Sequence, residues 1–261
     1  MRLFPLLKCS ATVLASILLV SACDTSGLYN FSGTQLVSVE RENSKGDRWT
    51  ESYQYDTSGR LIEIEQSDGD AVIRIIYEEG KIALLERYPG NLGKALYVDS
   101  LFYNAGGQLA RIREYGNRVG EGLLLNLHYE FDYYPSGLLQ SRSWYNGNNV
   151  EPSNTEVYYW QDGNIARIEE FSDGELRYEF LFSYDDKVNY NLGNPLHLAH
   201  PRMSWSENNV TVLDWRDYYG NYDALCRPCF WEYSYNLDGM PVSVKTEQGR
   251  WASHTKLRYT D

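Results

Sequence analysis

The sequence lacks the short motifs that mark the commonest enzyme and nucleotide sites. It has no glycine-rich phosphate loop, no Gly-x-Ser-x-Gly elbow and no serine, histidine and aspartate order typical of a hydrolase. Positive charge is also scarce, because 24 basic residues stand against 36 acidic ones and the formal net charge is −12. An acidic chain repels phosphate backbones, so we expect no nucleic-acid partner. These absences favour a protein that is not an enzyme and needs no cofactor.

Long apolar runs are missing too, apart from one near the N-terminus. Ala11–Val20 is apolar but too short for a stable membrane span, and it follows the basic residues Arg2 and Lys8. Residues 1–22 therefore form a targeting segment. The segment ends in Val20-Ser21-Ala22, and Cys23 follows it. These four residues resemble a bacterial lipobox, in which the cysteine is lipidated and becomes the new N-terminus. The alternative is an ordinary signal peptide with a nearby cysteine.

Lipidation of Cys23 predicts an address in the cell envelope of a Gram-negative bacterium. Acyl chains such as palmitate would anchor the chain firmly. Asp24 resembles an inner-membrane retention signal, but that rule depends on the lineage, so the outer membrane and the periplasmic face of the inner membrane both stay open. Residues 23–34 are small and polar, which is typical of a lipidated tether.

Cysteine is scarce, with four residues, and one pair has an informative spacing. Cys226 and Cys229 form a Cys-x-x-Cys motif. In redox proteins this motif begins a helix after a strand, whereas the residues that follow it here have the composition of a strand. In an oxidising envelope, a local disulfide is favoured over redox catalysis. A zinc site with His197 or His200 is a third alternative, but it lacks the second close pair of ligands that structural zinc sites usually show.

Two histidines and two tryptophans are the remaining candidates for ligand contact. His197 and His200 have an i, i+3 spacing that would suit a metal on a helix, but the flanking prolines leave little room for a helix. This favours packing within a loop and no metal. Trp144 and Trp160 lie at or near predicted turns, which makes them the better candidates for exposed contact with a ligand such as a sugar ring.

A repeated strand–turn–strand device fills most of the chain. A tyrosine is followed four positions later by glycine, and two positions after that by Leu, Ile or Pro. Full copies begin at Tyr55, Tyr103, Tyr133, Tyr159 and Tyr235, and shortened ones at Tyr77 and Tyr184. A regular period of this kind indicates a repeat architecture. Asp or Asn in the turn bonds to nearby backbone, and Gly supplies the positive φ that closes it.

The residues around each turn alternate between an apolar and a charged face, which is typical of antiparallel strands with one buried side. After the first turn, for example, we expect Ile62 and Ile64 on one face and Glu63 and Glu65 on the other. The same pattern pairs Ala110 with Ile112 and Ala166 with Ile168. The apolar faces are expected to meet in one shared interior.

Two strands per period predict an all-β antiparallel meander of about 14–18 hairpin strands in a single domain, residues 35–261. So large a sheet curls, and we expect a flattened or partly open barrel. Arg and Glu on its other face would be costly at lipid depth, so we expect a soluble barrel that is not transmembrane. Residues 189–230 break the repeat and form an irregular insertion or plug, which lies either inside the curl or outside it.

Several motifs resemble known repeat families. Tyr53–Leu61 resembles the YD repeat of Rhs-type proteins, which build curling β-shells, and Tyr133–Leu139 resembles MORN-like repeats. The mature chain resembles a family of uncharacterised lipoproteins with a porin-like β fold, through its lipobox, its hairpins, Asn194-Pro195, Asn208–Thr211 and Tyr233–Pro241. This resemblance implies a fold and an envelope address. It supplies no catalytic residues, and the Cys-x-x-Cys motif is not part of it.

We therefore expect a lipid-anchored envelope protein that acts as a binding or scaffold module. Its partners would be the membrane, through the anchor, and an unidentified protein or glycan. The alternative is a carbohydrate- or peptidoglycan-binding lipoprotein that uses aromatic rim residues. A third hypothesis, an envelope enzyme within residues 189–230, requires a pocket that gathers His197, His200 and an acid.

Overall fold

The computed structural model describes residues 30–31, 34–67, 71–89, 93–118, 121–192, 194–218, 228–249 and 251–260. Its strands are β1 (Asn30–Phe31), β2 (Thr34–Asn43), β3 (Arg48–Tyr55), β4 (Leu61–Gln66), β5 (Val72–Glu78), β6 (Lys81–Tyr88), β7 (Tyr97–Tyr103), β8 (Leu109–Arg118), β9 (Gly122–Tyr133), β10 (Leu139–Asn146), β11 (Asn154–Gln161), β12 (Asn164–Ser172), β13 (Glu175–Val188), β14 (Asn208–Asp217), β15 (Cys229–Tyr235), β16 (Pro241–Gln248) and β17 (Trp251–Tyr259). Two 3-10 helices, η2 (Pro195–His197) and η3 (Pro201–Met203), lie between β13 and β14. No helix in these ranges is long and apolar enough to cross a membrane.

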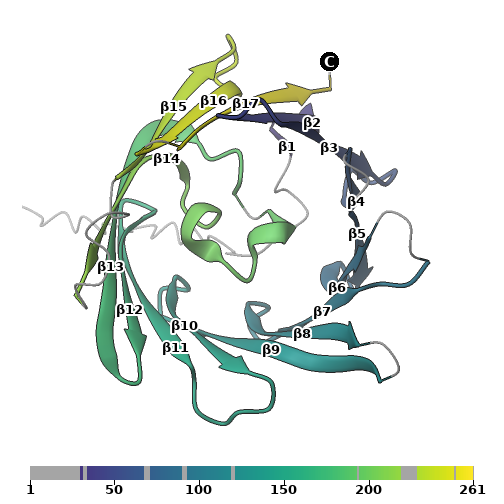
Figure 1. Ribbon diagram of the computed structural model, residues 1–261, viewed down its shortest axis with the longest axis vertical. Coiled ribbons are helices and arrows are strands. Elements are labelled where there is room, and N and C mark those ends of the chain that lie inside the picture. Colours follow the sequence, from purple (N-terminus) through teal and green to yellow (C-terminus); the bar gives the residue numbers. More distant parts are fainter. Residues whose placement is uncertain are drawn as a thin grey trace, which may run out of the picture.

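Strands β2 to β17 form a closed antiparallel barrel in which each strand pairs with the next along the chain (Figure 1). The ring closes where β17 pairs with β2, from Ser253–Asn43 to Tyr259–Leu36. The predicted all-β antiparallel meander is confirmed, and the sixteen strands of this described ring lie within the predicted range. The partly open barrel is wrong, because the first and last long strands pair along most of their length and leave no open edge.

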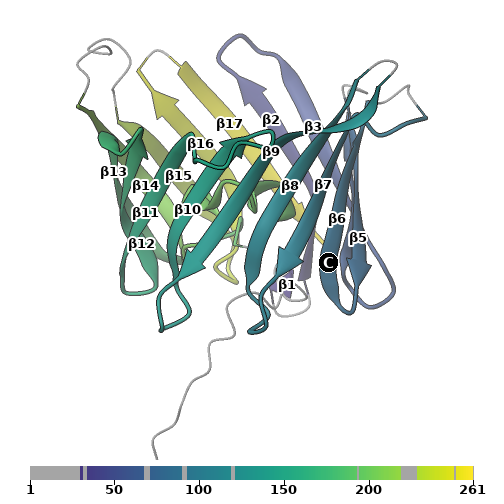
Figure 2. The ribbon, with the colours of Figure 1, turned by 90° about the horizontal axis from the view of Figure 1, so that it is seen from below.

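The two ends of the barrel differ in their connections. The short turns of the repeated motif gather at one end, here named the turn end, and the other connections gather at the loop end, as Figure 2 shows at its bottom and top. Asp56 organises the first such turn, since its Oδ1 accepts hydrogen bonds from the backbone N–H groups of Ser58 and Arg60, both at 2.9 Å. Gly59 closes that turn with a φ of 84°.

Inward-facing side chains form three layers, counted from the turn end. The first layer pairs an aromatic residue with an aliphatic one across each turn, at Tyr55–Leu61, Tyr77–Ile82, Tyr103–Leu109, Tyr133–Leu139, Trp160–Ile165, Tyr235–Pro241 and, at the closure, Tyr259–Leu36. Most of these aromatic side chains also donate to a backbone carbonyl of the preceding return strand. Tyr77 Oη reaches Leu61 O at 3.0 Å, and Tyr133 Oη reaches Leu109 O at 2.7 Å. Phenylalanine would fill the same space but leave the carbonyl without this donor, which explains the choice of tyrosine.

A β-bulge after the turn shifts the faces that the sequence predicts. Tyr55 pairs with Leu61 and Gln54 pairs with Glu63, so one extra residue, Ile62, lies between the two pairs. Leu61 and Ile64 consequently point inward, while Ile62 is 37% exposed. The expectation that Ile62 and Ile64 share a face is therefore wrong. The same bulge separates Ala110 from Ile112 and Ala166 from Ile168.

The second and third layers differ in polarity. Among the described residues, the second layer is apolar at Tyr53–Ile64, Ile75–Leu85, Leu101–Ile112, Tyr158–Ile168, Tyr233–Val244 and Leu257–Val39. Its exception is Phe131–Arg142, where an arginine takes the place of the aliphatic residue. The third layer, nearer the loop end, carries charged pairs such as Asp99–Glu114 and Glu156–Glu170. The apolar interior is thus confirmed, and it becomes polar toward the loop end.

The irregular insertion lies inside the barrel. Residues 189–192 and 194–207, here named the luminal segment, carry η2 and η3 through the centre of the ring (Figure 1). Tyr190 and Leu198 of this segment belong to the buried core. Its folding is local, since the Asn194 side chain caps η2 by accepting from Leu196 N at 2.9 Å. The predicted range of 189–230 is too long, because β14 within it is part of the wall.

The bulge gives a matched pair of isoleucines for a stability test. Ile64→Ala removes a side chain with 0% exposure and should lower the free energy of unfolding by about 2–5 kcal/mol. Ile62→Ala, two residues away on the outer surface, should cost less than about 1 kcal/mol. Urea unfolding followed by tryptophan fluorescence measures both. Equal losses would contradict the bulged register.

Candidate functional site

A cavity of about 530 Å³ lies between the luminal segment and the barrel wall. Its lining comes from three wall strands and both 3-10 helices, and comprises Leu127, Tyr129, Arg142, Trp144, Glu170, His197, His200, Arg202 and Met203. Tyr129 and Trp144 are a cross-strand pair of the third layer, and Leu127 lies one pair nearer the loop end. The cavity therefore belongs to the polar half of the lumen.

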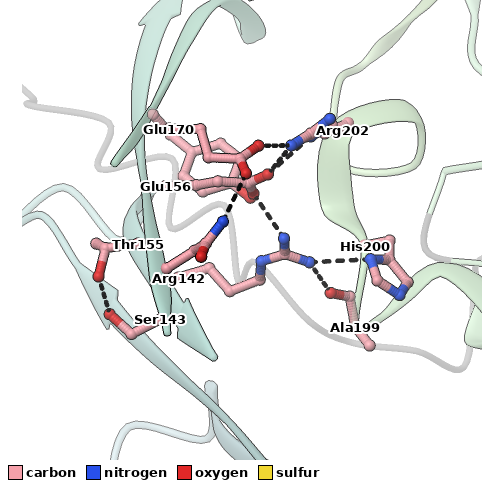
Figure 3. A network of polar contacts seen from close by, with 10 residues as sticks. Arg142, Ser143, Thr155, Glu156, Glu170, Ala199, His200 and Arg202 are labelled. Atoms are coloured by element: carbon pink, nitrogen blue, oxygen red, sulfur yellow. Dashed lines mark hydrogen bonds and ion pairs between the residues drawn. The ribbon is translucent and has the colours of Figure 1, made fainter. Parts of the chain in front are cut away.

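Two glutamates of the wall stand directly opposite each other beside this cavity. Glu156 on β11 and Glu170 on β12 are register partners, and like charges in that position repel. Arg202 of the luminal segment bridges them, with Nε 2.8 Å from Glu156 Oε1 and Nη2 2.6 Å from Glu170 Oε2 (Figure 3). Asn154 Nδ2 also donates to Glu170 at 2.8 Å. The luminal segment thus supplies the cation that the wall needs.

Arg142 makes the second link between the wall and the luminal segment. Its side chain is 4% exposed, and its Nη2 lies 3.0 Å from Glu156 Oε2. Its Nη1 donates to the backbone carbonyl of Ala199 and, at 3.1 Å, to His200 Nδ1 (Figure 3). A buried arginine requires a charged partner and hydrogen-bond acceptors, and the luminal segment provides two of these acceptors. Arg142 therefore binds both the wall and the segment.

The electrostatics of this cluster fix the charge of each group. Burial alone would raise the pKa of Glu156, but the guanidinium groups of Arg142 and Arg202 outweigh it and hold that pKa below its usual range. Desolvation in the lumen, followed by the charge of Arg142, lowers the pKa of His200 to about 4. Burial, followed by Arg41, lowers the pKa of His197. At neutral pH both histidines are uncharged and the ion pairs are intact.

Three of the four residues that the sequence singled out for ligand contact line the cavity. Trp144, His197 and His200 lie together, whereas Trp160 does not line it. The Trp160 ring belongs to the first layer, and its Nε1 donates to Leu139 O at 2.7 Å. The expectation that Tyr159 begins its copy of the repeat is therefore wrong. Trp160 takes the place of the repeat tyrosine, because it pairs with Ile165, while Tyr159 pairs with Arg167 on the outer face.

The structure does not test the two predictions about cysteine, lipidation of Cys23 and a disulfide between Cys226 and Cys229. Cys23 and Cys226 lie outside the described residues, so neither lipidation nor the disulfide is tested. Cys229 is buried at the start of β15, where burial raises the pKa of its thiol. For the histidines, His200 Nδ1 points to the Arg142 guanidinium, which occupies the position that a metal would need at that atom.

Sequence reasoning missed Arg142, Glu156, Glu170 and Arg202. One signal was present in the repeat. Three copies of the repeat have an aliphatic residue nine positions after the tyrosine that begins the copy, namely Ile64, Ile112 and Val244. Arg142 holds the same position after Tyr133. An arginine in an aliphatic column indicates a buried charge that needs a partner. Nothing comparable in the sequence identifies Arg202 as a second cation that pairs with Glu156 and Glu170.

No protein-family model and no curated protein matches this chain. Among solved structures, the chain is similar to a porin-like protein from Bacteroides uniformis ATCC 8492, with a TM-score of 0.58 and 12% identity over 86% of this chain and 96% of that one. It is also similar to a porin-like protein from Bacteroides vulgatus ATCC 8482, with a TM-score of 0.54 and 11% identity over 86% and 98% of the two chains. At these identities the likeness shows the fold alone, a porin-like β-barrel.

A third similarity is too weak to support an argument. The TcdB2-TccC3-Cdc42 structure aligns with 82% of this chain at 14% identity, but the match covers 12% of that chain with a TM-score of 0.36. The predicted porin-like β fold is thus confirmed at the level of the fold. Membership of a lipoprotein family and the kinship with YD repeats stay predictions.

The bridge between Arg202 and the two glutamates predicts a specific rescue. Arg202→Met leaves Glu156 and Glu170 opposed and should lower the free energy of unfolding by about 2–4 kcal/mol. Adding Glu170→Gln removes the repulsion, keeps the Arg142–Glu156 pair, and should restore at least half of that loss. The control, Arg48→Met, breaks an exposed ion pair with Glu42 and should cost less than about 1 kcal/mol. Denaturant unfolding that shows no rescue would contradict the bridge.

Proposed function

We propose that this protein is a lipid-anchored cell-envelope binding module whose luminal cavity is the ligand site. The observation that carries the proposal is the cavity itself, which is bordered by aromatic side chains, ion pairs and neutral histidines. Its volume of about 530 Å³ lies in the range of small-molecule sites, which are concave, largely apolar and equipped with a few placed polar groups. Arg142 in its lining and the neighbouring Glu156 are buried and mutually paired, which suits a preorganised binding wall.

The address rests on the lipobox at Cys23 and agrees with the porin-like fold of the two Bacteroides proteins. A soluble outer surface is supported by ion pairs between neighbouring strands. Arg74 lies 3.1 Å from Glu63, and Arg111 lies 2.7 Å from Glu130. Such charges on a lipid-facing wall would cost several kcal/mol each. We therefore propose that the barrel stands in water and is held to a membrane by its anchor.

The anchor would also orient the barrel. The chain enters the barrel at the turn end, where Asn30 and Phe31 of β1 pair with the start of β2. The cavity lies toward the opposite, loop end. A membrane anchor N-terminal to β1 would accordingly hold the turn end toward the bilayer and present the loop end to the surrounding compartment.

Replacement of Cys23 tests the anchor. Cys23→Ser removes the thiol that lipidation requires, so the protein should move from the detergent-extracted membrane fraction to the soluble fraction. Fractionation followed by immunoblotting measures the distribution. Mass spectrometry of the purified mature chain should find three acyl chains in the protein that keeps Cys23 and none in the Cys23→Ser variant. Retention of the serine variant in the membrane fraction would contradict the proposed anchor.

Filling the cavity tests the binding function. Purified soluble protein without residues 1–23 is screened by thermal shift against sugars, cell-wall fragments, amines and fatty acids. We expect at least one class to raise Tm in proportion to its concentration. Leu127→Trp fills the cavity and should abolish the shift, whereas Leu123→Trp, on the exposed end of the same strand, should not. No stabilising compound, or equal shifts in both variants, would contradict the proposal.

An envelope enzyme is a second candidate, because the cavity gathers His197, His200 and the acid Glu170. This is the arrangement that the enzyme hypothesis requires. Three contacts favour binding instead, since Glu170 is engaged by Arg202 and Asn154, and His200 Nδ1 is engaged by Arg142. The same compounds, incubated with the protein and analysed by mass spectrometry, separate the two functions. Turnover that Glu170→Gln abolishes would establish the enzyme.

A further inference from the structure

We infer that the ligand of the luminal cavity is a neutral saccharide, which packs on Trp144 beside the buried Tyr129 and hydrogen-bonds to His200, Arg202 and Glu170. This inference deepens the proposed function and rests on it, because it names the chemical class that the cavity selects. Three properties of the lining carry the inference: its balanced charge, its aromatic surface and its mixture of hydrogen-bond donors and acceptors.

The charges around the cavity are already paired with one another. Arg142 and Arg202 are the cations of the cluster, and Glu156 and Glu170 are the anions. His197 and His200 add no charge at neutral pH, because desolvation and the nearby arginines lower the pKa of each. A charged ligand would have to compete with an existing ion pair, and a neutral ligand would not. The cluster thus offers strong dipoles and little net charge.

The aromatic surface comes from a single cross-strand pair. Trp144 on β10 and Tyr129 on β9 are register partners, so their rings project into the lumen side by side. Arg142 Cζ lies over both rings, 4.8 Å from the Trp144 centroid and 5.7 Å from the Tyr129 centroid, so its guanidinium makes a cation–π contact with each. A pyranose ring has a flat face of C–H groups edged by hydroxyls. Such a face matches an aromatic surface with polar groups at its border.

The polar groups provide donors and acceptors within the same cavity. Arginine can only donate, so the bond from Arg142 Nη1 makes His200 Nδ1 the acceptor and puts the proton of the neutral ring on Nε2. His200 is exposed to the cavity and presents that Nε2–H as a donor. Arg202, with a side chain that is 28% exposed, adds a cationic donor. Glu170 adds a carboxylate acceptor, and sugar hydroxyls can bond to all three because they both donate and accept.

The experiment compares neutral and charged oligosaccharides on the soluble protein. Isothermal titration calorimetry is carried out with cellobiose, maltose and N,N′-diacetylchitobiose as neutral probes, and with digalacturonate and chitosan dimer as charged ones of matched size. We expect saturable binding of at least one neutral probe and at least about tenfold weaker binding of both charged probes. Trp144→Ala should weaken the neutral probe by about tenfold or more, and Trp251→Ala, on an exposed strand end outside the cavity, should leave it within twofold.

Two further measurements keep the outcome decisive. Circular dichroism melts verify that Trp144→Ala folds, and Trp144→Phe, which keeps an aromatic face, should recover part of the affinity. Neutral probes that do not bind, or that bind equally to the Trp144→Ala and Trp251→Ala variants, would overturn the saccharide inference. If an amine or fatty acid then stabilises the protein and Leu127→Trp abolishes that effect, the binding function stands and only the ligand class is wrong.

Discussion

A barrel of sixteen strands encloses more space than its own wall can fill, and this constraint shapes the rest of the structure. Eight strands give an interior that side chains just fill, while barrels of about sixteen leave an open channel. Here Tyr, Leu and Ile fill the turn end layer by layer, and the luminal segment occupies the centre. The segment cannot be wholly apolar, because its backbone carries polar groups that need partners away from water. A filled lumen therefore demands a polar contact between the segment and the wall.

The arginine and glutamate cluster meets that demand and creates the candidate site as a consequence. Arg142 interrupts an otherwise apolar layer of the wall and reaches the Ala199 carbonyl, while Arg202 comes from the segment and reaches two wall carboxylates. Each side supplies the partner that the buried charges of the other side need. The cavity lies where this polar contact meets the aromatic pair of the third layer. The residues that fix the segment are thus the same ones that we propose for ligand recognition.

The sequence predicted the architecture well, because the repeat is short-range. The Tyr–Gly spacing of the turns and the alternation of faces depend on neighbouring residues, and they yielded the strand number, the antiparallel pairing and the inward apolar face. The bulge was missed, since alternation alone cannot show the extra residue that places Ile62 outside and Ile64 inside. Closure was missed because the contact of β17 with β2 joins the two ends of the chain. Residue type singled out Trp144, His197 and His200, which line the cavity. The contact between Arg202 and Glu156 spans 46 positions, and no local pattern encodes it.

The central claim is that the luminal segment is a fixed part of the interior. Hydrogen exchange of its backbone amides tests this most directly, because protection requires stable hydrogen bonds that are shielded from water. His197 N donates to Asn194 O at 2.9 Å, and Tyr190 N donates to Asn209 Oδ1 at 3.1 Å. The account predicts that these two amides exchange nearly as slowly as those of the wall strands. Exchange at the rate of an unfolded peptide, with the wall strands still protected, would contradict it.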